Sequence, residues 1–145
     1  MRRKAITLVL LLGLAGPASA WEFTPGLPCL LTHESGDVVV ELTFDPTLPR
    51  YTISVTTSDP WPRAPRFGMQ FLGPRGLSIG TTRHQFSDGG RTLSVADSGF
   101  GNVLNGLQFN ERAVATNGER SVSFSLEGAA PEVAAFRECS IAPAA

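Results

Sequence analysis

The stretch Ser121-Val-Ser-Phe-Ser-Leu-Glu-Gly-Ala-Ala-Pro-Glu-Val-Ala-Ala-Phe-Arg-Glu-Cys139 predicts how this chain closes its fold. Residues at its start alternate between polar and apolar types, which is the period of a half-buried strand. A glycine turn follows, and Pro131 suits the first position of a helix whose buried stripe would contain Val133 and Phe136. We therefore expect a closing strand and a short helix whose last turn carries Cys139.

The sequence contains one other cysteine, Cys29. In an exported chain two cysteines favour a disulfide over free thiols or a metal site. A Cys29–Cys139 bond would join the two ends of the mature chain, and a closed loop of about 100 residues corresponds to roughly 4.7 kcal/mol in the chain-entropy account. The alternative is a structural zinc, which takes four nitrogen or sulfur ligands and would need both cysteines with His33 and His84. The compartment favours the disulfide.

Residues 1–20 have the pattern of an export signal. A basic start at residues 2–4 precedes an apolar run at residues 6–16, and Ala18-Ser-Ala20 supplies a small-x-small cleavage pattern. The apolar run is shorter than the ~20 residues that a membrane span needs, and Pro17 ends it. We predict cleavage after Ala20, a periplasmic or secreted location, and a single β-rich domain over residues 21–145.

Charge and composition exclude several classes of function. Without the three basic residues of the signal, the chain keeps nine arginines against thirteen acidic residues, a formal net charge of −4, and no lysine. A Schiff-base site and a phosphate loop both need a lysine, and the glycine-rich residues 99–106 lack the Gly-Lys-Ser/Thr ending of such a loop. An acidic domain also lacks the positive field that non-specific nucleic-acid binding requires. We expect no nucleic acid, cofactor or metal ion as partner.

Short runs of β-branched and aromatic residues alternate with turn signals through the rest of the chain. The predicted strands are residues 38–44, 51–57, 67–72, 77–81, 91–96, 113–116 and 120–126. The first two predict an antiparallel hairpin, and Asn117-Gly118 suits a type I′ turn between the last two. Residues 21–29 contain two prolines and are expected to be extended and irregular.

A short helix is predicted within residues 97–109, where four apolar residues recur at helical spacing. About seven short strands, with turns every eight to twelve residues, indicate an all-β fold. We predict a single-domain antiparallel sandwich or open barrel with one or two short helices, including the C-terminal one.

Two histidines, His33 and His84, are the only candidates for a general base. A Ser-His-Asp site could use either one, but the chain has no Gly-x-Ser-x-Gly elbow. We expect His33 to lie in a loop and pack around the disulfide, and His84 to be a surface imidazole. The two histidines and the missing elbow motif therefore favour a protein without enzymatic activity.

The best candidate for a binding site is the proline-rich segment, residues 58–65, with the residues that follow it. Its candidate binding residues are Trp61, Arg63, Arg66 and Phe67. A proline-stiffened aromatic ring beside guanidinium groups could stack on a ring or hold an anion at little ordering cost. The competing interpretation is that Trp61 folds over a sheet edge, since tryptophan is usually largely buried, and that the arginines are solvated.

The segment Val122-Ser-Phe-Ser-Leu-Glu-Gly-Ala-Ala-Pro-Glu-Val-Ala-Ala-Phe136 resembles the closing segment of the invasion-associated locus B family, in which a Phe-Ser-Leu-x-Gly strand end precedes an alanine-rich helix. The resemblance covers roughly residues 100–139. It implies a small, exported, β-rich bacterial protein without an established enzymatic activity. This chain has fewer cysteines than that family and an acidic mature composition, which weakens the case for an invasion role.

The chain also resembles small alphaproteobacterial secreted proteins. The similar segments are Trp21-Glu-Phe23, Cys29-Leu-Leu-Thr-His33 and Gly99-Phe-Gly-Asn-Val-Leu-Asn-Gly-Leu107. Some of those proteins are named after an excinuclease component, but this chain has no helicase motif and is far too short for that function.

Three hypotheses of function follow. The first is an exported, non-enzymatic β-domain that binds a protein or cell-envelope partner through the proline-rich segment. The second is a small secreted hydrolase that uses His33 or His84. The third is an inhibitor of an exported enzyme.

Overall fold

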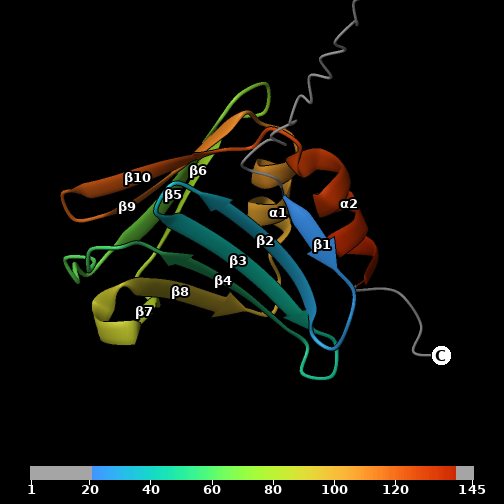
Figure 1. The fold of residues 1–145 in the computed structure, drawn as a ribbon, viewed down its shortest axis with the longest axis horizontal. Coiled ribbons are helices and arrows are strands. Elements are labelled where there is room, and N and C mark those ends of the chain that lie inside the picture. Colours follow the sequence, from blue (N-terminus) through green and yellow to red (C-terminus); the bar gives the residue numbers. More distant parts are fainter. Residues whose placement is uncertain (1–20, 140–145) are drawn as a thin grey trace, which may run out of the picture.

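The computed structural model describes residues 21–139 of the chain, so the predicted export signal lies outside the described residues. Within them the fold has ten strands in two antiparallel sheets and two α-helices (Figure 1). The sheets face each other without closing into a barrel, which confirms the predicted antiparallel sandwich.

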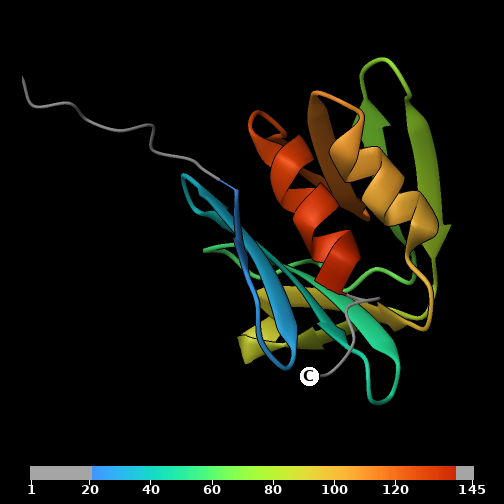
Figure 2. The same ribbon diagram turned by 90° about the vertical axis from the view of Figure 1, so that its right-hand side faces the viewer.

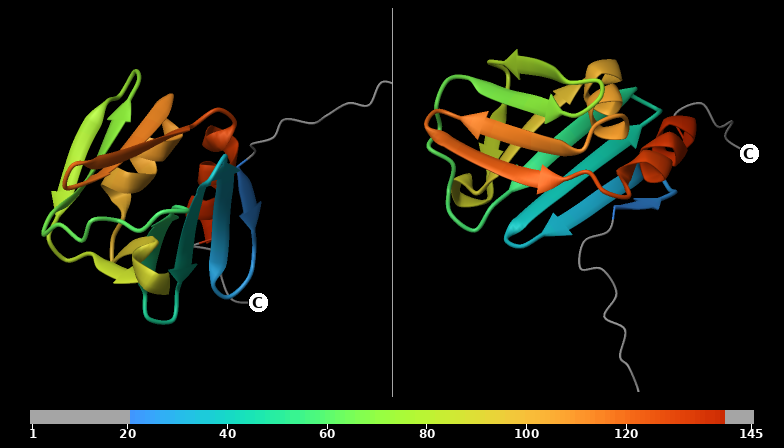
Figure 3. Two further views of the ribbon diagram at one scale, coloured as in Figure 1. Left: turned by 60° about the vertical axis from the view of Figure 1, so that its left-hand side comes forward. Right: turned by 90° about the horizontal axis from the view of Figure 1, so that it is seen from above.

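The larger sheet has six strands. In spatial order they are β1 (Glu22–Thr24), β2 (Cys29–Ser35), β3 (Val38–Asp45), β4 (Arg50–Thr56), β8 (Thr92–Asp97) and β7 (Gln85–Ser87). The smaller sheet has four, in the order β10 (Arg120–Ser125), β9 (Arg112–Asn117), β5 (Phe67–Leu72) and β6 (Leu77–Thr81). Figure 3 shows the strands of one sheet inclined to those of the other.

Alternating side chains explain why β3 and β4 form the centre of the larger sheet. On β3 the residues Val38, Val40, Leu42 and Phe44 are all buried, and the residues between them are more exposed. Val40 pairs with Val55 of β4, and Leu42 pairs with Ile53, so the two apolar faces coincide. The predicted hairpin of residues 38–57 is confirmed.

The helices α1 (Gly101–Gln108) and α2 (Ala129–Cys139) lie side by side at one end of the space between the sheets (Figure 2). Helix α2 buries Val133 and Phe136, as its sequence predicts, and contacts β1 and β2. Helix α1 packs closely against β5 at Gly106. A Cβ atom at this position would overlap the ring of Phe71. Only glycine fits there.

Three strands and one turn differ from the predictions. β1, β2 and the short β7 were not expected; β1 lies within the segment predicted to be irregular, and β2 begins where that segment ends. One buried position of β2 is a histidine and not an apolar residue, so the sequence does not show the alternation that predicts a strand. In the last hairpin Asn117 pairs with Arg120, so Gly118-Glu119 forms the turn, and Gly118 has the positive φ of +62°.

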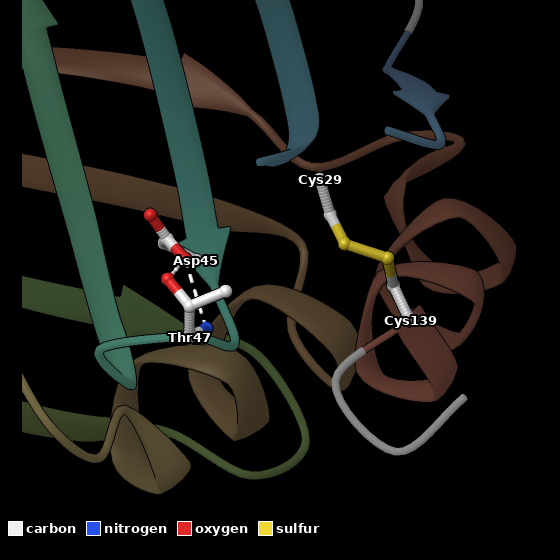
Figure 4. Close-up of a disulfide and its surroundings, with 4 residues drawn as sticks. All are labelled: Cys29, Asp45, Thr47 and Cys139. Atoms are coloured by element: carbon white, nitrogen blue, oxygen red, sulfur yellow. Dashed lines mark hydrogen bonds between the residues drawn. A yellow bond between two sulfur atoms is a disulfide. The ribbon is translucent and has the colours of Figure 1, made fainter. Parts of the chain in front are cut away.

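The predicted disulfide is present. Cys29 at the start of β2 is bonded to Cys139 at the end of α2, with their Cα atoms 6.5 Å apart (Figure 4). The bond uses both cysteines, so the alternative of a zinc site is wrong. The disulfide fits a non-cytoplasmic compartment. Neither helix in the described part of the chain has the length and apolar content of a membrane span.

Candidate functional site

A cavity of about 470 Å³ lies between the two sheets, and we call it the inter-sheet cavity. One wall comes from β4 and β8 of the larger sheet, and the other comes from β5 and β6 of the smaller sheet. The connection from β8 to α1 and the first turn of α1 complete it. Five elements, from β4 to α1, therefore meet at this site.

Apolar side chains from both sheets form the deeper part of the inter-sheet cavity, and polar groups, among them Thr81, Arg83 and Asn102, form much of the rest of its lining. Its apolar lining side chains are Ile53, Phe67, Met69, Ile79, Val95, Phe100 and Val103. Two cross-strand pairs face each other across the space: Ile53 with Val95 on one sheet, and Met69 with Ile79 on the other. Ile53 and Met69 are buried, whereas Ile79 and Val95 are only half-buried, so the space deepens from the rim toward β4 and β5.

An ion pair joins the two walls at the rim of the cavity. Arg83, which follows β6, lies 3.7 Å from Asp97 at the end of β8, and the side chains are 78% and 45% exposed. The backbone N–H of Ser98 also donates to Asp97 Oδ1 at 2.7 Å, and the N–H of Arg83 donates to Thr81 Oγ1 at 3.0 Å. The first bond orients the carboxylate of Asp97, and the second fixes the backbone from which the Arg83 side chain extends.

The first turn of α1 lies at the same rim. Gly101, Asn102 and Val103 are its first three residues, and all three line the cavity. The first turn contains no acidic residue, and its N-cap, Phe100, makes no capping bond through its side chain. The positive end of the helix dipole therefore lies at the mouth without a carboxylate of its own turn to offset it.

The proline-rich segment is held down against the fold. Trp61 is only 2% exposed, and its indole N–H donates to the carbonyl oxygen of Val55 at 3.2 Å. The guanidinium of Arg120 covers the ring at 5.2 Å. Phe67 is buried as well and lines the inter-sheet cavity. The two predicted aromatic binding residues are therefore part of the core.

The two predicted arginines of this region are exposed. Arg63 has a positive φ of 67°, and its guanidinium carbon lies 5.5 Å from the centre of the Phe86 ring. Arg66 lines a separate shallow hollow of about 510 Å³ on the outer side of the smaller sheet, beside Gly68 and Gly80. Partner binding by this segment stays a prediction; of its four candidate residues, Arg63 and Arg66 are exposed.

Asn117 fixes the proline-rich segment. The sequence did not predict this role, because Asn117-Gly118 was interpreted as a type I′ turn. The side chain is fully buried, and its amide nitrogen donates to the carbonyl oxygens of Ala64 and Arg66 at 3.1 and 2.9 Å. Its amide oxygen accepts from the N–H of Ala64 at 3.0 Å. One side chain thus satisfies three backbone groups of a segment whose prolines cannot form a regular ladder.

His33 lies in β2 and not in a loop. Its ring is 1% exposed and stacks on Trp21, with ring centres 4.5 Å apart and planes inclined by 3°. The indole N–H of Trp21 donates to the carbonyl oxygen of Ser125 at 3.1 Å, which fixes the stack against β10. The expected loop position was wrong, because a buried imidazole here substitutes for an apolar residue of the strand.

His84 is half-buried rather than a surface imidazole. Its Nε2 atom is hydrogen-bonded to the carbonyl oxygen of Ala64 at 2.9 Å. The centres of its ring and the Phe86 ring are 5.3 Å apart, with the planes inclined by 83°. The side chain therefore links the loop after β6 to the proline-rich segment. Among the described residues, no cluster of three or more His, Cys, Asp or Glu side chains could hold a metal ion.

The pKa of Asp45, in the turn between β3 and β4, is lowered by local hydrogen bonds (Figure 4). The hydroxyl and backbone N–H of Thr47 donate to its carboxylate at 2.6 and 2.9 Å, and both bonds lower the pKa of Asp45 below its ordinary value of 3.8. The bonds are those of a local Asx turn, as expected for aspartate at turns. They hold the turn and form no site.

Sequence reasoning did not identify the inter-sheet cavity. Its rim residues Arg83 and Asp97 carry no motif, and they become neighbours only when the two sheets pack. The one signal was the glycine-rich connection at residues 99–106, which brings the backbone of the α1 start to the rim without bulky side chains at Gly99 and Gly101.

Comparison of the chain with protein-family models, with curated proteins and with solved structures finds no match. The resemblances of its sequence to the invasion-associated locus B family and to small secreted proteins stay predictions.

Proposed function

We propose that this chain is an exported, non-enzymatic binding domain that holds a small apolar molecule in the inter-sheet cavity. The observation that carries the proposal is the cavity itself, with buried apolar side chains from both sheets and a polar rim. Pockets that bind small molecules have volumes of roughly 300–1,000 Å³ and combine apolar side chains with a few polar groups. A volume of about 470 Å³ lies within that range.

The space between the sheets is a hollow that opens to solvent and not a closed packing defect. Protein interiors otherwise pack at the density of organic crystals. The rest of this core leaves side chains such as Leu31, Phe71 and Leu107 almost fully covered. A space that the remainder of the core avoids supports a role in function.

The positions of the two histidines support a non-enzymatic role. A general base must lie within hydrogen-bond reach of the proton that it removes. His33 is covered by Trp21, and Nε2 of His84 is bonded to a backbone carbonyl. Neither lines the inter-sheet cavity.

Export is the second part of the proposal, and it rests on the basic, apolar and small-x-small order of residues 1–20. The Cys29–Cys139 disulfide supports it, since such bonds persist in oxidising compartments. Our second candidate function is the binding of a protein or envelope partner at the exposed Arg63 and Arg66, of which Arg66 lines the outer hollow of the smaller sheet.

The cavity is tested by blocking it. Val95→Phe places a larger side chain in the space, and the matched Val39→Phe adds the same volume on the exposed outer face of β3. With 1-decanol as the probe, chemical-shift titration of the labelled protein is expected to show saturable changes around Ile79 and Phe100. Val95→Phe is expected to abolish them, and Val39→Phe is expected to retain them.

Two results would contradict the proposed function. One is the absence of saturable binding to the wild-type protein. The other is binding that Val95→Phe leaves unchanged, because the probe would then occupy another place.

A further inference from the structure

We infer that the natural ligand of the inter-sheet cavity is an amphiphilic monocarboxylate, whose apolar tail lies between the sheets and whose carboxylate binds Arg83. This inference rests on the proposed function and specifies the class of ligand. It follows from which hydrogen-bonding groups at the rim are already engaged and which are not.

The rim carries one guanidinium, that of Arg83, and one carboxylate, that of Asp97. Both oxygens of Asp97 are engaged, Oδ1 by the N–H of Ser98 at 2.7 Å and Oδ2 by Arg83 at 3.7 Å. Arg83 uses Nη2 for this contact, and its side chain is 78% exposed. A guanidinium has five N–H donors in a planar fork, and that fork matches the two oxygens of a carboxylate. The guanidinium of Arg83 therefore has donors beyond its contact with Asp97 that can meet a ligand carboxylate at the mouth.

A ligand can reach Arg83 at little cost to the fold. The Arg83–Asp97 ion pair is exposed, and such pairs contribute little to stability because water screens them. Asp97 holds the guanidinium over the mouth while the cavity is empty. An entering carboxylate can then share or replace Asp97 as its partner.

The start of α1 adds to the preference for an anion. Its first turn lines the mouth and contains no acidic residue, so the positive end of the helix dipole lies near the position of the ligand head. A cationic head would face both this dipole and Arg83. Its charged partner would be Asp97, which already contacts Arg83 and the N–H of Ser98.

The interior suits a tail without polar groups. The pairs Ile53–Val95 and Met69–Ile79 line opposite walls, and the deeper member of each pair is 2% and 3% exposed, respectively. The charged residues among those that line the cavity are Arg83 and Asp97, and both stand at its rim. Methionine adapts its shape readily, which lets such a space accept tails that differ by a few methylene groups.

Three probes with the same tail and different heads test the inference: decanoate, 1-decanol and decylammonium, titrated calorimetrically below the concentration at which they form micelles. We expect decanoate to bind most tightly and decylammonium most weakly. Arg83→Gln is expected to weaken decanoate by up to about fivefold, because the guanidinium is exposed and water screens its interaction with a carboxylate, and to leave 1-decanol unchanged. The matched variant Arg75→Gln, at the turn between β5 and β6, is expected to change neither.

Two further measurements sharpen the assignment. Asp97→Asn removes the competing carboxylate from Arg83 and is expected to tighten decanoate several-fold. Shortening the probe to octanoate is expected to weaken binding by up to about fourfold for each methylene group removed, since each one buried contributes to affinity.

The outcomes separate this inference from the function on which it rests. Equal binding of decanoate and 1-decanol, with no effect of Arg83→Gln, would overturn the carboxylate and leave the apolar cavity intact. Tightest binding of decylammonium would overturn it in favour of Asp97 as the head-binding residue. Failure of all three probes to bind would overturn both the inference and the proposed function.

Discussion

The proline-rich segment and the mouth of the inter-sheet cavity make an informative contrast. The segment has the composition of a binding loop, with a tryptophan, two arginines and three prolines within or beside it. The structure buries its tryptophan and ties its backbone to Asn117. The mouth has no distinctive composition, yet it combines an exposed ion pair, the start of a helix and an apolar interior.

The contrast teaches that an unusual local sequence can mark a structural solution as readily as a site. The segment joins the larger sheet at β4 to the smaller sheet at β5. A crossing chain cannot continue a ladder, so its polar groups need partners from side chains, and its aromatic ring seals the end of the core. The mouth arises instead where the sheets fail to fill the space between them.

The largest expected effect comes from Trp61→Ala. Removing this buried ring is expected to lower the free energy of unfolding by about 3–5 kcal/mol, because large-to-small changes in a core leave a cavity. Urea titration followed by circular dichroism measures the loss. Affinity for 1-decanol per folded molecule is expected to stay the same, because Trp61 does not line the inter-sheet cavity.

Ile79→Ala at the mouth is the counterpart of this variant and is expected to give the opposite pattern. Its side chain is half-buried, so the loss of stability is expected to stay below about 1.5 kcal/mol, while 1-decanol binds more weakly. If Trp61→Ala instead kept the stability of the wild type and lost binding, the proline-rich segment would be the site and the contrast would be reversed.

Strand alternation is the part of the fold that the sequence predicts well. The runs around Val40, Ile53 and Phe124 alternate over several residues, and each becomes a strand with those residues inside. Val133 and Phe136 likewise predict the buried face of α2, and the two cysteines predict the disulfide. Local periodicity and simple counting suffice for these features.

The remaining features depend on distant contacts. β2 was not predicted because His33 interrupts its apolar pattern. The imidazole is favourable at this buried position because Trp21, just before β1, stacks on it. The site was missed for the same reason, because Arg83 and Asp97 meet only through the packing of two sheets. Such pairings are properties of the tertiary fold and have no local pattern.

A smaller effect is expected from Asn117→Ala, which removes the side chain that fixes the proline-rich segment. Three backbone groups of Ala64 and Arg66 would lose their partner, and a buried polar group left unsatisfied costs about 1–3 kcal/mol. Hydrogen exchange of the Ala64 amide is expected to accelerate as well. The matched variant Asn102→Ala, at the exposed start of α1, is expected to change stability by less than about 0.5 kcal/mol; equal losses in the two variants would show that Asn117 does not fix the segment.

The smallest difference in stability is expected from exchanging one arginine for lysine in each region. Arg120 Nη1 contacts Thr57 Oγ1 and the carbonyl oxygens of Asp59 and Pro60 at 2.7–3.1 Å, while its guanidinium plane covers Trp61. Lysine keeps the charge but loses the planar group, so Arg120→Lys is expected to cost about 1 kcal/mol. Arg83→Lys is expected to cost less than about 0.5 kcal/mol, because its ion pair is exposed.

Ligand binding is expected to reverse that order, because the same exchange acts on a different property in each region. At Arg120 the guanidinium stabilises the segment, so Arg120→Lys leaves affinity for decanoate unchanged. At Arg83 the fork receives the carboxylate, and an ammonium cannot reproduce two parallel hydrogen bonds, so Arg83→Lys is expected to weaken decanoate without weakening 1-decanol. If affinity followed stability in both variants, the arginines would have one common role, and the division between a region that holds the fold and a region that holds a ligand would be lost.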